Sequence, residues 1–274
     1  MEARRLVGAW LAVGVALASA GVRADDPAAP EPDRFDTVVI DAGHGGDDQG
    51  ARGAGGMLEK DVVLEVAQRL RARLLALGYR VVLTREDDRK VSLHDRVSRA
   101  NEARGDLFVS IHANAARESF VRGVETFFLS LEASDDAARA LARAENEAFE
   151  GMGLEREAGG DALLGILGDL MVSEHMIESN EFARMAQQAL ALGDAVPSRG
   201  VKQAPFVVLM GVQMPACLVE IGFLSNARDE RDLSRAQRRE EVAEALALSI
   251  VRFAERYDAR RGVAARPPVA AGGN

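Results

Sequence analysis

The sequence has little cysteine and a shortage of basic side chains, and each shortage excludes a class of protein. Cys217 is the only cysteine, so no disulfide can form within the chain. Lys and Arg number 34 against 43 Asp and Glu, which gives a formal net charge of −9. This balance argues against a broad phosphate-binding surface for nucleic acid. Beyond the first two dozen residues no apolar run is long enough to cross a membrane, so we expect no membrane span in the mature protein.

The first residues have the pattern of an export signal. Arg4 and Arg5 precede an apolar run over 6–22, and a small-x-Ala end follows at 22–24. This order predicts a secretory signal peptide over 1–24, cleaved after Ala24, with cleavage after Ala20 or an uncleaved anchor as alternatives. The mature protein is then exported, and the periplasm is the expected compartment.

The rest of the chain predicts one compact domain between two segments without a core-forming pattern. Residues 25–34 form a polar, proline-containing lead-in, and residues 258–274 form an Arg-, Ala-, Pro- and Gly-rich tail that we expect to be disordered. Between them, over 35–257, apolar strands alternate with amphipathic helices. This alternation predicts an α/β fold of three α/β/α layers, with a mostly parallel, twisted six-stranded sheet and helices on both faces. The expected strands cover 35–41, 79–84, 107–111, 124–129, 206–210 and 217–221; the expected helices cover 58–77, 93–103 and 239–257.

A long helical stretch interrupts this alternation. Residues 133–195 have helical patterns and no predicted strand, which is more than a crossover between strands needs. We interpret 133–177 as a helical insertion with its own purpose.

Polar side chains stand where apolar strands end. His44 follows the strand at 35–41 in a glycine-rich loop, His112 follows the strand at 107–111, and Glu220 interrupts the apolar run of 217–221. Ligands of open α/β sheets bind at the carboxyl ends of strands. Glu59 opens the next helix, whose start returns to that edge. Two imidazoles, a carboxylate and an open position make a catalytic zinc site, and a further carboxylate can move a proton there. The residues alone therefore indicate a possible hydrolytic zinc site.

Several separated segments together carry a resemblance to a known family. They are VVIDAGHGGDDQGARG, LEKDVVLEVAQRL, LTREDDRKVSLHDRVSRAN, DLFVSIHANA, GVETFFLS and RGVKQAPFVVLMGVQMPACLVEIGFLSN. In this order they resemble the catalytic domain of the zinc-dependent N-acetylmuramoyl-L-alanine amidases of the bacterial cell wall, over about 36–257.

The resemblance implies a metal site, a reaction and a substrate. One zinc ion per chain would be held by His44, Glu59 and His112, with Glu220 as the catalytic carboxylate. The substrate would be peptidoglycan, cleaved at the amide between N-acetylmuramic acid and L-alanine. Asn114 is a candidate for orienting substrate, and Lys202 is a candidate for lining the groove.

The long insert also resembles a feature of the amidases that separate daughter cells, in which a helical insert covers the zinc until an activator protein displaces it. We therefore expect an acidic side chain of 133–177 to block or bind the metal, and an activator to dock on this insert. The candidates for the blocking side chain are Glu155, Glu157, Asp161, Asp169 and Glu174.

Two other functions remain as alternatives. One is a different exported zinc peptidase or amidohydrolase on the same scaffold. The other is a catalytically inactive protein that binds or regulates the cell wall. The presence of all three expected zinc ligands and of Glu220 argues against the second.

Overall fold

The computed structural model describes residues 34–150, 174–191 and 196–264. The expected signal peptide, and all of the lead-in but its last residue, lie outside these ranges, as does the tail beyond 264. The sheet is built from β1 (Thr37–Ala42), β2 (Arg80–Leu83), β3 (Leu107–Asn114), β4 (Val124–Leu129), β5 (Ser198–Ala204) and β6 (Ala216–Phe223).

The six strands lie in the order β2-β1-β3-β6-β4-β5. Strands β2, β1, β3 and β6 are parallel to one another, and β4 pairs with β6 antiparallel and with β5 parallel. The mostly parallel six-stranded sheet is therefore confirmed. Because β1, β3 and β6 run the same way, their carboxyl ends lie at one edge of the sheet.

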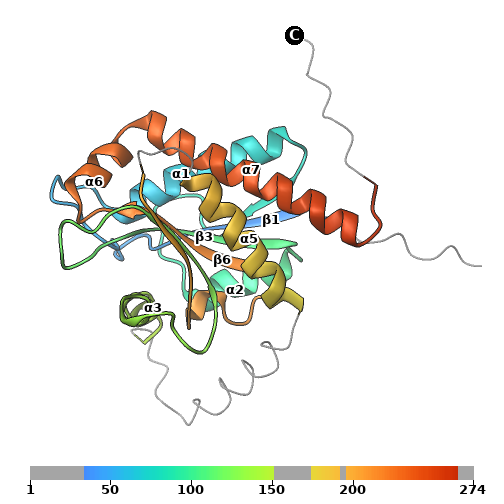
Figure 1. Cartoon of the computed structure of the whole chain (residues 1–274), viewed down its shortest axis with the longest axis horizontal. Helices are drawn as coiled ribbons and strands as arrows, with labels where there is room; N and C mark the ends of the chain where they lie inside the picture. The colour runs from blue at the N-terminus through green and yellow to red at the C-terminus, as the bar shows by residue number, and fades with distance from the viewer. Residues whose placement is uncertain (1–33, 151–173, 192–195, 265–274) are drawn as a thin grey trace, which may run out of the picture. The chain divides into compact units, whose positions relative to one another are not determined.

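Helices cover both faces of the sheet (Figure 1). Helices α1 (Glu59–Ala76), α5 (Glu174–Leu190) and α7 (Ala236–Arg260) lie on one face; α2 (Leu93–Glu102), α3 (Asp136–Glu150) and the 3₁₀ turn η1 (Val207–Leu209) lie on the other. Helix α6 (Ala227–Ser234) follows β6 directly.

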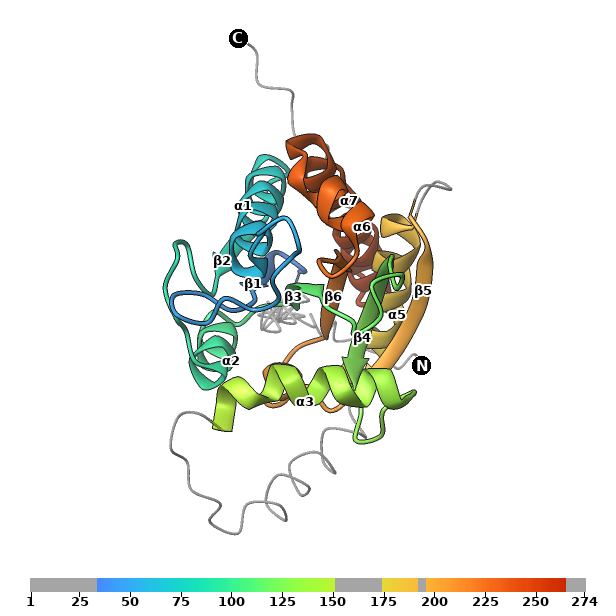
Figure 2. The same cartoon turned by 90° about the vertical axis from the view of Figure 1, so that its left-hand side faces the viewer.

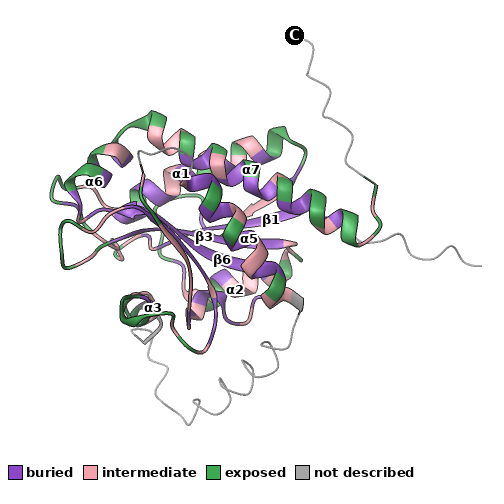
Figure 3. Cartoon of the chain, viewed as in Figure 1, coloured by how far each residue is buried: buried purple, intermediate pink, exposed green. Residues whose placement is uncertain are grey.

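The sheet separates two hydrophobic cores, one on each face, and successive residues of the central strands point into them alternately. Val38 and Ile40 pack with α1, α5 and α7, whereas Val39 packs with α2 and α3. Side chains alternate across a strand, so a strand buried on both faces is apolar throughout. Figure 3 shows this burial along the central strands. The three-layer prediction is confirmed.

One predicted strand is wrong and another was missed. The run 206–210 contains the 3₁₀ turn η1 over Val207–Leu209 rather than a strand, and the sixth strand is β5. The apolar run 206–210 packs into the core of α2 and α3 as a turn, so its apolar character reflects burial and not strand pairing. Strand β5 lies at the edge of the sheet and is only half-buried, so it carries polar residues. Its sequence therefore lacks the apolar pattern by which a strand is predicted.

The boundaries of α2 agree closely with expectation, whereas those of α7 differ at both ends. Ser92 caps α2, since its side chain accepts a hydrogen bond from the backbone N–H of Asp95. Helix α7 starts before the expected 239 and continues to Arg260, so helix extends three residues into the predicted tail.

Candidate metal centre

The loop after β1 presents His44 in a constrained conformation. His44 has φ 58°, in the left-handed region that favours glycine. A turn follows it at once, because Gly45 and Asp48 exchange backbone hydrogen bonds of 2.9 and 3.2 Å. A non-glycine residue with positive φ persists only where its surroundings fix it.

Two buried arginines hold the backbone of this loop through hydrogen bonds to its carbonyl oxygens. Arg96 donates to the carbonyl oxygens of Ala42 and His44 at 2.6 and 2.7 Å. Arg85, which is fully buried, donates to those of Ala42 and Gly43 at 2.9 and 2.8 Å. The backbone of the loop is thus held by charged donors at three successive carbonyls.

Asp41, at the end of β1, compensates the charge of Arg96. Its Oδ1 lies 2.6 Å from Nη1 of Arg96, and it also accepts hydrogen bonds from Thr84 and Ser110. Burial alone would raise the pKa of Asp41, but Arg96 and these hydrogen bonds hold it below its usual value. The ion pair is therefore a permanent part of the support under the loop.

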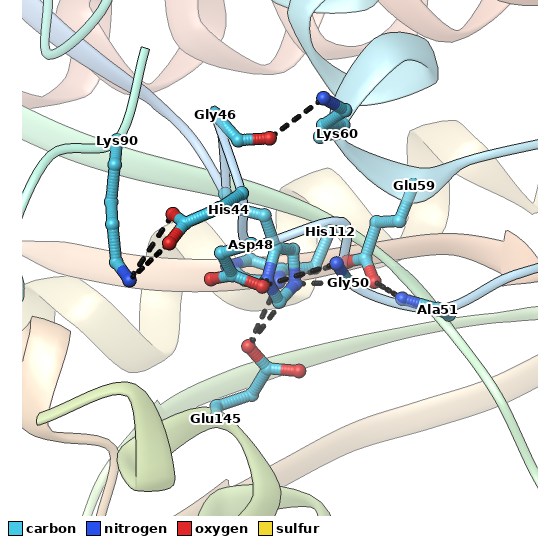
Figure 4. Close-up of polar contacts among 12 residues, drawn as sticks. His44, Gly46, Asp48, Gly50, Ala51, Glu59, Lys60, Lys90, His112 and Glu145 are labelled. Carbon is cyan, nitrogen blue, oxygen red and sulfur yellow. Dashed lines mark hydrogen bonds and ion pairs between the residues drawn. The ribbon is translucent and has the colours of Figure 1, made fainter. Parts of the chain in front are cut away.

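Glu59 and His112 lie opposite His44 (Figure 4). The Glu59 carboxylate accepts hydrogen bonds from the backbone N–H groups of Ala51 and Ala113, at 2.7 and 2.9 Å, which fix its orientation. The His112 ring packs on Gly43, where a Cβ would lie 2.4 Å from its Cε1 atom. Gly43 is needed here because only a residue without Cβ leaves room for the ring.

These three side chains and Glu145 of α3 converge. Glu59 lies 3.1 Å from Nε2 of His44 and 3.0 Å from Nδ1 of His112. One oxygen of Glu145 lies 3.5 Å and 3.2 Å from the same two nitrogens. One donor atom from each of the four residues lies within 4.8 Å of the others, a group that could hold a metal ion.

The donor set fits zinc. Imidazole nitrogens and carboxylate oxygens are its usual ligands besides thiolate. Nε2 of His44 is buried without a hydrogen-bond partner among the described residues, as expected of an atom that awaits a metal. Its other nitrogen, Nδ1, lies 3.0 Å from both oxygens of Asp48. A carboxylate on the far side of a ligating histidine fixes the ring and its tautomer.

The charges of the cluster favour a cation at its centre. Burial lowers the pKa of His44, but Glu59, Asp48 and Glu145 outweigh this effect and raise it to about 11. Burial would raise the pKa of Glu59, but His44 and His112 hold it well below its usual range. Burial raises the pKa of Glu145, with a further contribution from the charge of Glu59. A divalent ion would relieve this crowding of carboxylates.

Glu220 lies beside the cluster on β6. It is fully buried, it is the cross-strand partner of His112, and neither carboxylate oxygen has a hydrogen-bond partner among the described residues. Burial raises the pKa of Glu220 well above its usual value, and the charges of Glu59, Glu145 and Glu125 raise it further. A buried carboxylate without partners is costly, which points to a chemical role.

Asn114 lies at the end of β3, and its side chain is occupied within the protein. Its amide nitrogen donates to Glu125 at 3.0 Å, and both residues are buried. Its predicted contact with substrate stays a prediction, while its contact with Glu125 is a structural one.

Helix α3 lies across the candidate metal centre and is held there by hydrogen bonds and packing. Figure 2 shows it running from the α2 side of the sheet to the β4 and β5 side. Asn146 clamps it, donating to the carbonyl oxygen of Pro205 and accepting from the N–H of Val207, both at 2.8 Å. Ala138 and Ala142, on the inner face of α3, are buried. A cavity of about 380 Å³ remains between α3, the His44 loop and the 90–96 segment.

The structure brings the predicted zinc ligands together and adds two residues that the sequence did not single out. Glu145 lies within the 133–177 insert, on the same helix face as Ala138 and Ala142. It follows Ala142 by three residues, and Ala142 follows Ala138 by four, so the helical spacing could have identified it. Asp48 follows His44 by four residues in the glycine loop. Of the acidic candidates of the insert, Glu155, Glu157, Asp161 and Asp169 lie outside the described residues, and Glu174 opens α5 with a side chain that is not described.

Comparison with known proteins gives consistent matches. The family model described as N-acetylmuramoyl-L-alanine amidase matches residues 38–252. The chain is 33% identical to the amidase AmiC of Neisseria meningitidis, covering 84% of this chain and 55% of that protein. It is 35% identical to AmiA of Escherichia coli K12, covering 81% and 77%. It thus spans about half the length of AmiC.

A solved structure has the same fold. It is the CwlD amidase from Clostridioides difficile in complex with the GerS lipoprotein, which matches with a TM-score of 0.59 and 25% identity. The match covers 80% of this chain and 98% of that one.

Proposed function

Since the chain belongs to the N-acetylmuramoyl-L-alanine amidase family, we propose that it hydrolyses the amide bond between N-acetylmuramic acid and L-alanine in peptidoglycan. The single observation that carries this proposal is the convergence of His44, Glu59 and His112 beside Glu220, whose carboxylate has no hydrogen-bond partner among the described residues. The sequence resemblance assigns the same four residues to zinc binding and catalysis.

His44, Glu59 and His112 would hold one zinc ion through Nε2, a carboxylate oxygen and Nδ1. When bound, zinc supplies Lewis-acid activation of a water molecule and of the scissile carbonyl. Asp48 keeps the His44 ring in place, and the packing of Gly43 keeps the His112 ring in place. These supports hold the donor atoms in position before the metal arrives.

Glu220 would transfer the proton. Burial raises the pKa of Glu220 well above its usual value, and a carboxylate with a raised pKa can accept a proton from the attacking water and then donate it to the departing amine of L-alanine. Its burial keeps bulk water from competing for that proton. Its place on β6, next to His112 in the sheet, positions it at the edge where the zinc ligands meet.

The insert would regulate this centre by autoinhibition. A catalytic zinc keeps one position open, and the Glu145 carboxylate, within 3.5 Å of both ligating histidine nitrogens, would fill it. We assign the blocking role to Glu145, a residue that was not among the five candidates of the insert. Activity would then require α3 to leave its place.

A partner protein would release α3. The CwlD amidase is solved in complex with the GerS lipoprotein, which supports the idea that amidases of this fold bind partner proteins. Activation by a partner that docks on the insert would confine hydrolysis to places where daughter cells separate.

The place of action would be the periplasm, reached through the export signal over 1–24. In the described ranges we find no helix with the length and apolar character needed to span a membrane. The substrate lies outside the cytoplasm, which agrees with export.

The decisive experiment is a mass-spectrometric digest of purified peptidoglycan by the zinc-loaded protein and by its Glu145→Ala variant, each with a chelated control. Zinc-dependent release of stem peptides that begin with L-alanine is the expected result. Zinc-dependent cleavage of another bond would instead identify a different peptidase or amidohydrolase. Binding of peptidoglycan without any cleavage by either protein would identify an inactive wall-binding protein.

A further inference from the structure

Strand β5 contains an irregularity next to the candidate centre. Val124 of β4 pairs with Ser198, and Thr126 pairs with Val201, so the single residue Glu125 faces both Arg199 and Gly200. Gly200 has φ +86°, a conformation that favours glycine. One extra residue on one strand is a β-bulge, and bulges beside active sites commonly redirect a side chain. Here the redirected side chain is that of Arg199.

Glu125 holds the Arg199 side chain in place by an ion pair. Glu125 is only 3% exposed, and one of its oxygens accepts a hydrogen bond from Nε of Arg199 at 3.0 Å and forms an ion pair with Nζ of Lys202 at 3.1 Å. The other oxygen accepts from Asn114 at 3.0 Å. The carboxylate is therefore saturated by partners within the protein and holds Arg199 through one side of its guanidinium group.

The guanidinium plane has a second support. Its central carbon lies 5.1 Å from the centroid of the Phe223 ring, a cation–π contact with a buried aromatic residue. The terminal nitrogens Nη1 and Nη2 have no hydrogen bond or ion pair within the described part of the chain, and the side chain is 30% exposed. Two adjacent N–H donors held in a plane match the two oxygens of a carboxylate.

The neighbouring cation is already occupied. Lys202 shares its donors between Glu125 and Asp135, at 3.1 Å each, and its side chain is only 12% exposed. Among the described residues at this corner, Arg199 thus keeps donors, Nη1 and Nη2, without a hydrogen-bond partner. The corner adjoins the reaction centre, because Glu125 and Glu220 are direct cross-strand partners on β4 and β6.

We infer that Arg199 is an anion subsite that binds a carboxylate of the peptide part of the substrate through Nη1 and Nη2. Glu125 and Phe223 act as positioning residues for it. This inference rests on the proposed amidase function, since the ligand is a peptide bearing free carboxylates beside Glu220. An ion pair there would orient the peptide relative to the scissile amide, and it would favour acidic stem peptides over amidated ones.

Direct binding of a synthetic stem peptide, beginning with L-alanine, tests the subsite without any need for cleavage. Calorimetry would compare the peptide with free carboxylates and the same peptide with carboxamides, using the full-length protein and its Arg199→Met, Arg199→Lys and Arg228→Met variants. Arg228 is an exposed arginine of α6 and serves as the matched control.

Amidation of the peptide and Arg199→Met should each weaken binding roughly tenfold to a hundredfold, the range for loss of a charged hydrogen-bond pair. Their effects should not add, because they remove the same contact. Arg199→Lys keeps the charge and should restore only part of the affinity, while Arg228→Met should have no effect. Equal binding of both peptides by the unaltered protein would overturn the inference.

The same peptides attached to N-acetylmuramic acid separate this inference from the proposed function. If they are cleaved, KM should rise on amidation with little change in kcat. Cleavage with the same KM for both forms would overturn the subsite while leaving the amidase proposal in place. Arg199-dependent peptide binding without cleavage, also in the zinc-loaded Glu145→Ala variant, would support the subsite and count against the amidase proposal.

Discussion

Each oxygen of the Asp48 carboxylate lies 3.0 Å from Nδ1 of His44, so the Nε2 atom of the same ring is directed at Glu59. His112 presents the opposite nitrogen, Nδ1, to the same point. The two imidazoles are therefore oriented by different means: His44 by a carboxylate, and His112 by the space above Gly43. Each support offers a separate test of the metal centre.

Asp48→Asn should weaken zinc binding by about 10- to 100-fold, because it removes the charge that fixes the His44 ring. Competition with a chelating dye measures the dissociation constant. Asp47→Asn is the matched control, since Asp47 is exposed and pairs only with Lys90 among the described residues. Equal zinc affinity in Asp48→Asn and the unaltered protein would show that Asp48 does not position the ligand.

Glu145→Ala should raise hydrolysis of peptidoglycan at least about tenfold, equivalent to about 1.4 kcal/mol, because it removes the carboxylate that fills the open zinc position. Release of dye-labelled fragments from purified peptidoglycan measures the rate. Glu147→Ala removes an exposed carboxylate two residues along the same helix and should leave the rate unchanged. A fall in activity in Glu145→Ala would instead make Glu145 a required ligand.

Asn146→Ala should loosen α3 without touching the metal ligands, because it removes the two hydrogen bonds to the 205–207 segment. At about 1 kcal/mol for each bond, the docked state should be weakened by about 2 kcal/mol. Hydrogen exchange would show faster exchange of the α3 amides, with higher peptidoglycan hydrolysis.

Asn180→Ala is the control for this change, since the Asn180 side chain accepts from Arg184 on the same helix and has no other side-chain hydrogen bond to a described residue. Unchanged α3 exchange in Asn146→Ala would mean that the buried alanines alone hold the helix.

Asp41→Asn should cost about 3–5 kcal/mol of unfolding free energy at neutral pH, because it leaves the buried Arg96 without its partner. The pKa of Asp41 in the folded protein is lowered from 3.8. The ion pair therefore stabilises the fold fully above about pH 3.8, and this contribution is lost as the pH falls through the lowered pKa.

Urea unfolding at a series of pH values checks this dependence. The difference between Asp41→Asn and the unaltered protein should shrink below about pH 3.8. Asp61→Asn, at an exposed position of α1, should show no such difference. A gap that persists undiminished at low pH would assign the loss to packing rather than to charge.

The order of elements was largely readable from the sequence, and the wrong strand at 206–210 and the missed strand β5 both have local causes. Strands such as β3 are apolar throughout because both faces are buried, which is a property of the strand itself. The segment 206–210 has the same apolar character but packs as a 3₁₀ turn, and β5 is polar because it lies at an edge. Local pattern reports burial, and it cannot distinguish a buried turn from a buried strand.

The sequence by itself determined the fold class and which side chains meet at the carboxyl edge of the sheet. His112 and Glu220 lie on two parallel strands and His44 directly follows a third, so the topology brings them together. Three relationships came from the tertiary structure alone: Glu145 reaches the same point, Asp48 fixes His44, and the terminal nitrogens of Arg199 have no hydrogen bond to any described residue. These relationships depend on where a helix crosses, how a loop turns and where a bulge falls, and such contacts between distant segments leave no period in the sequence.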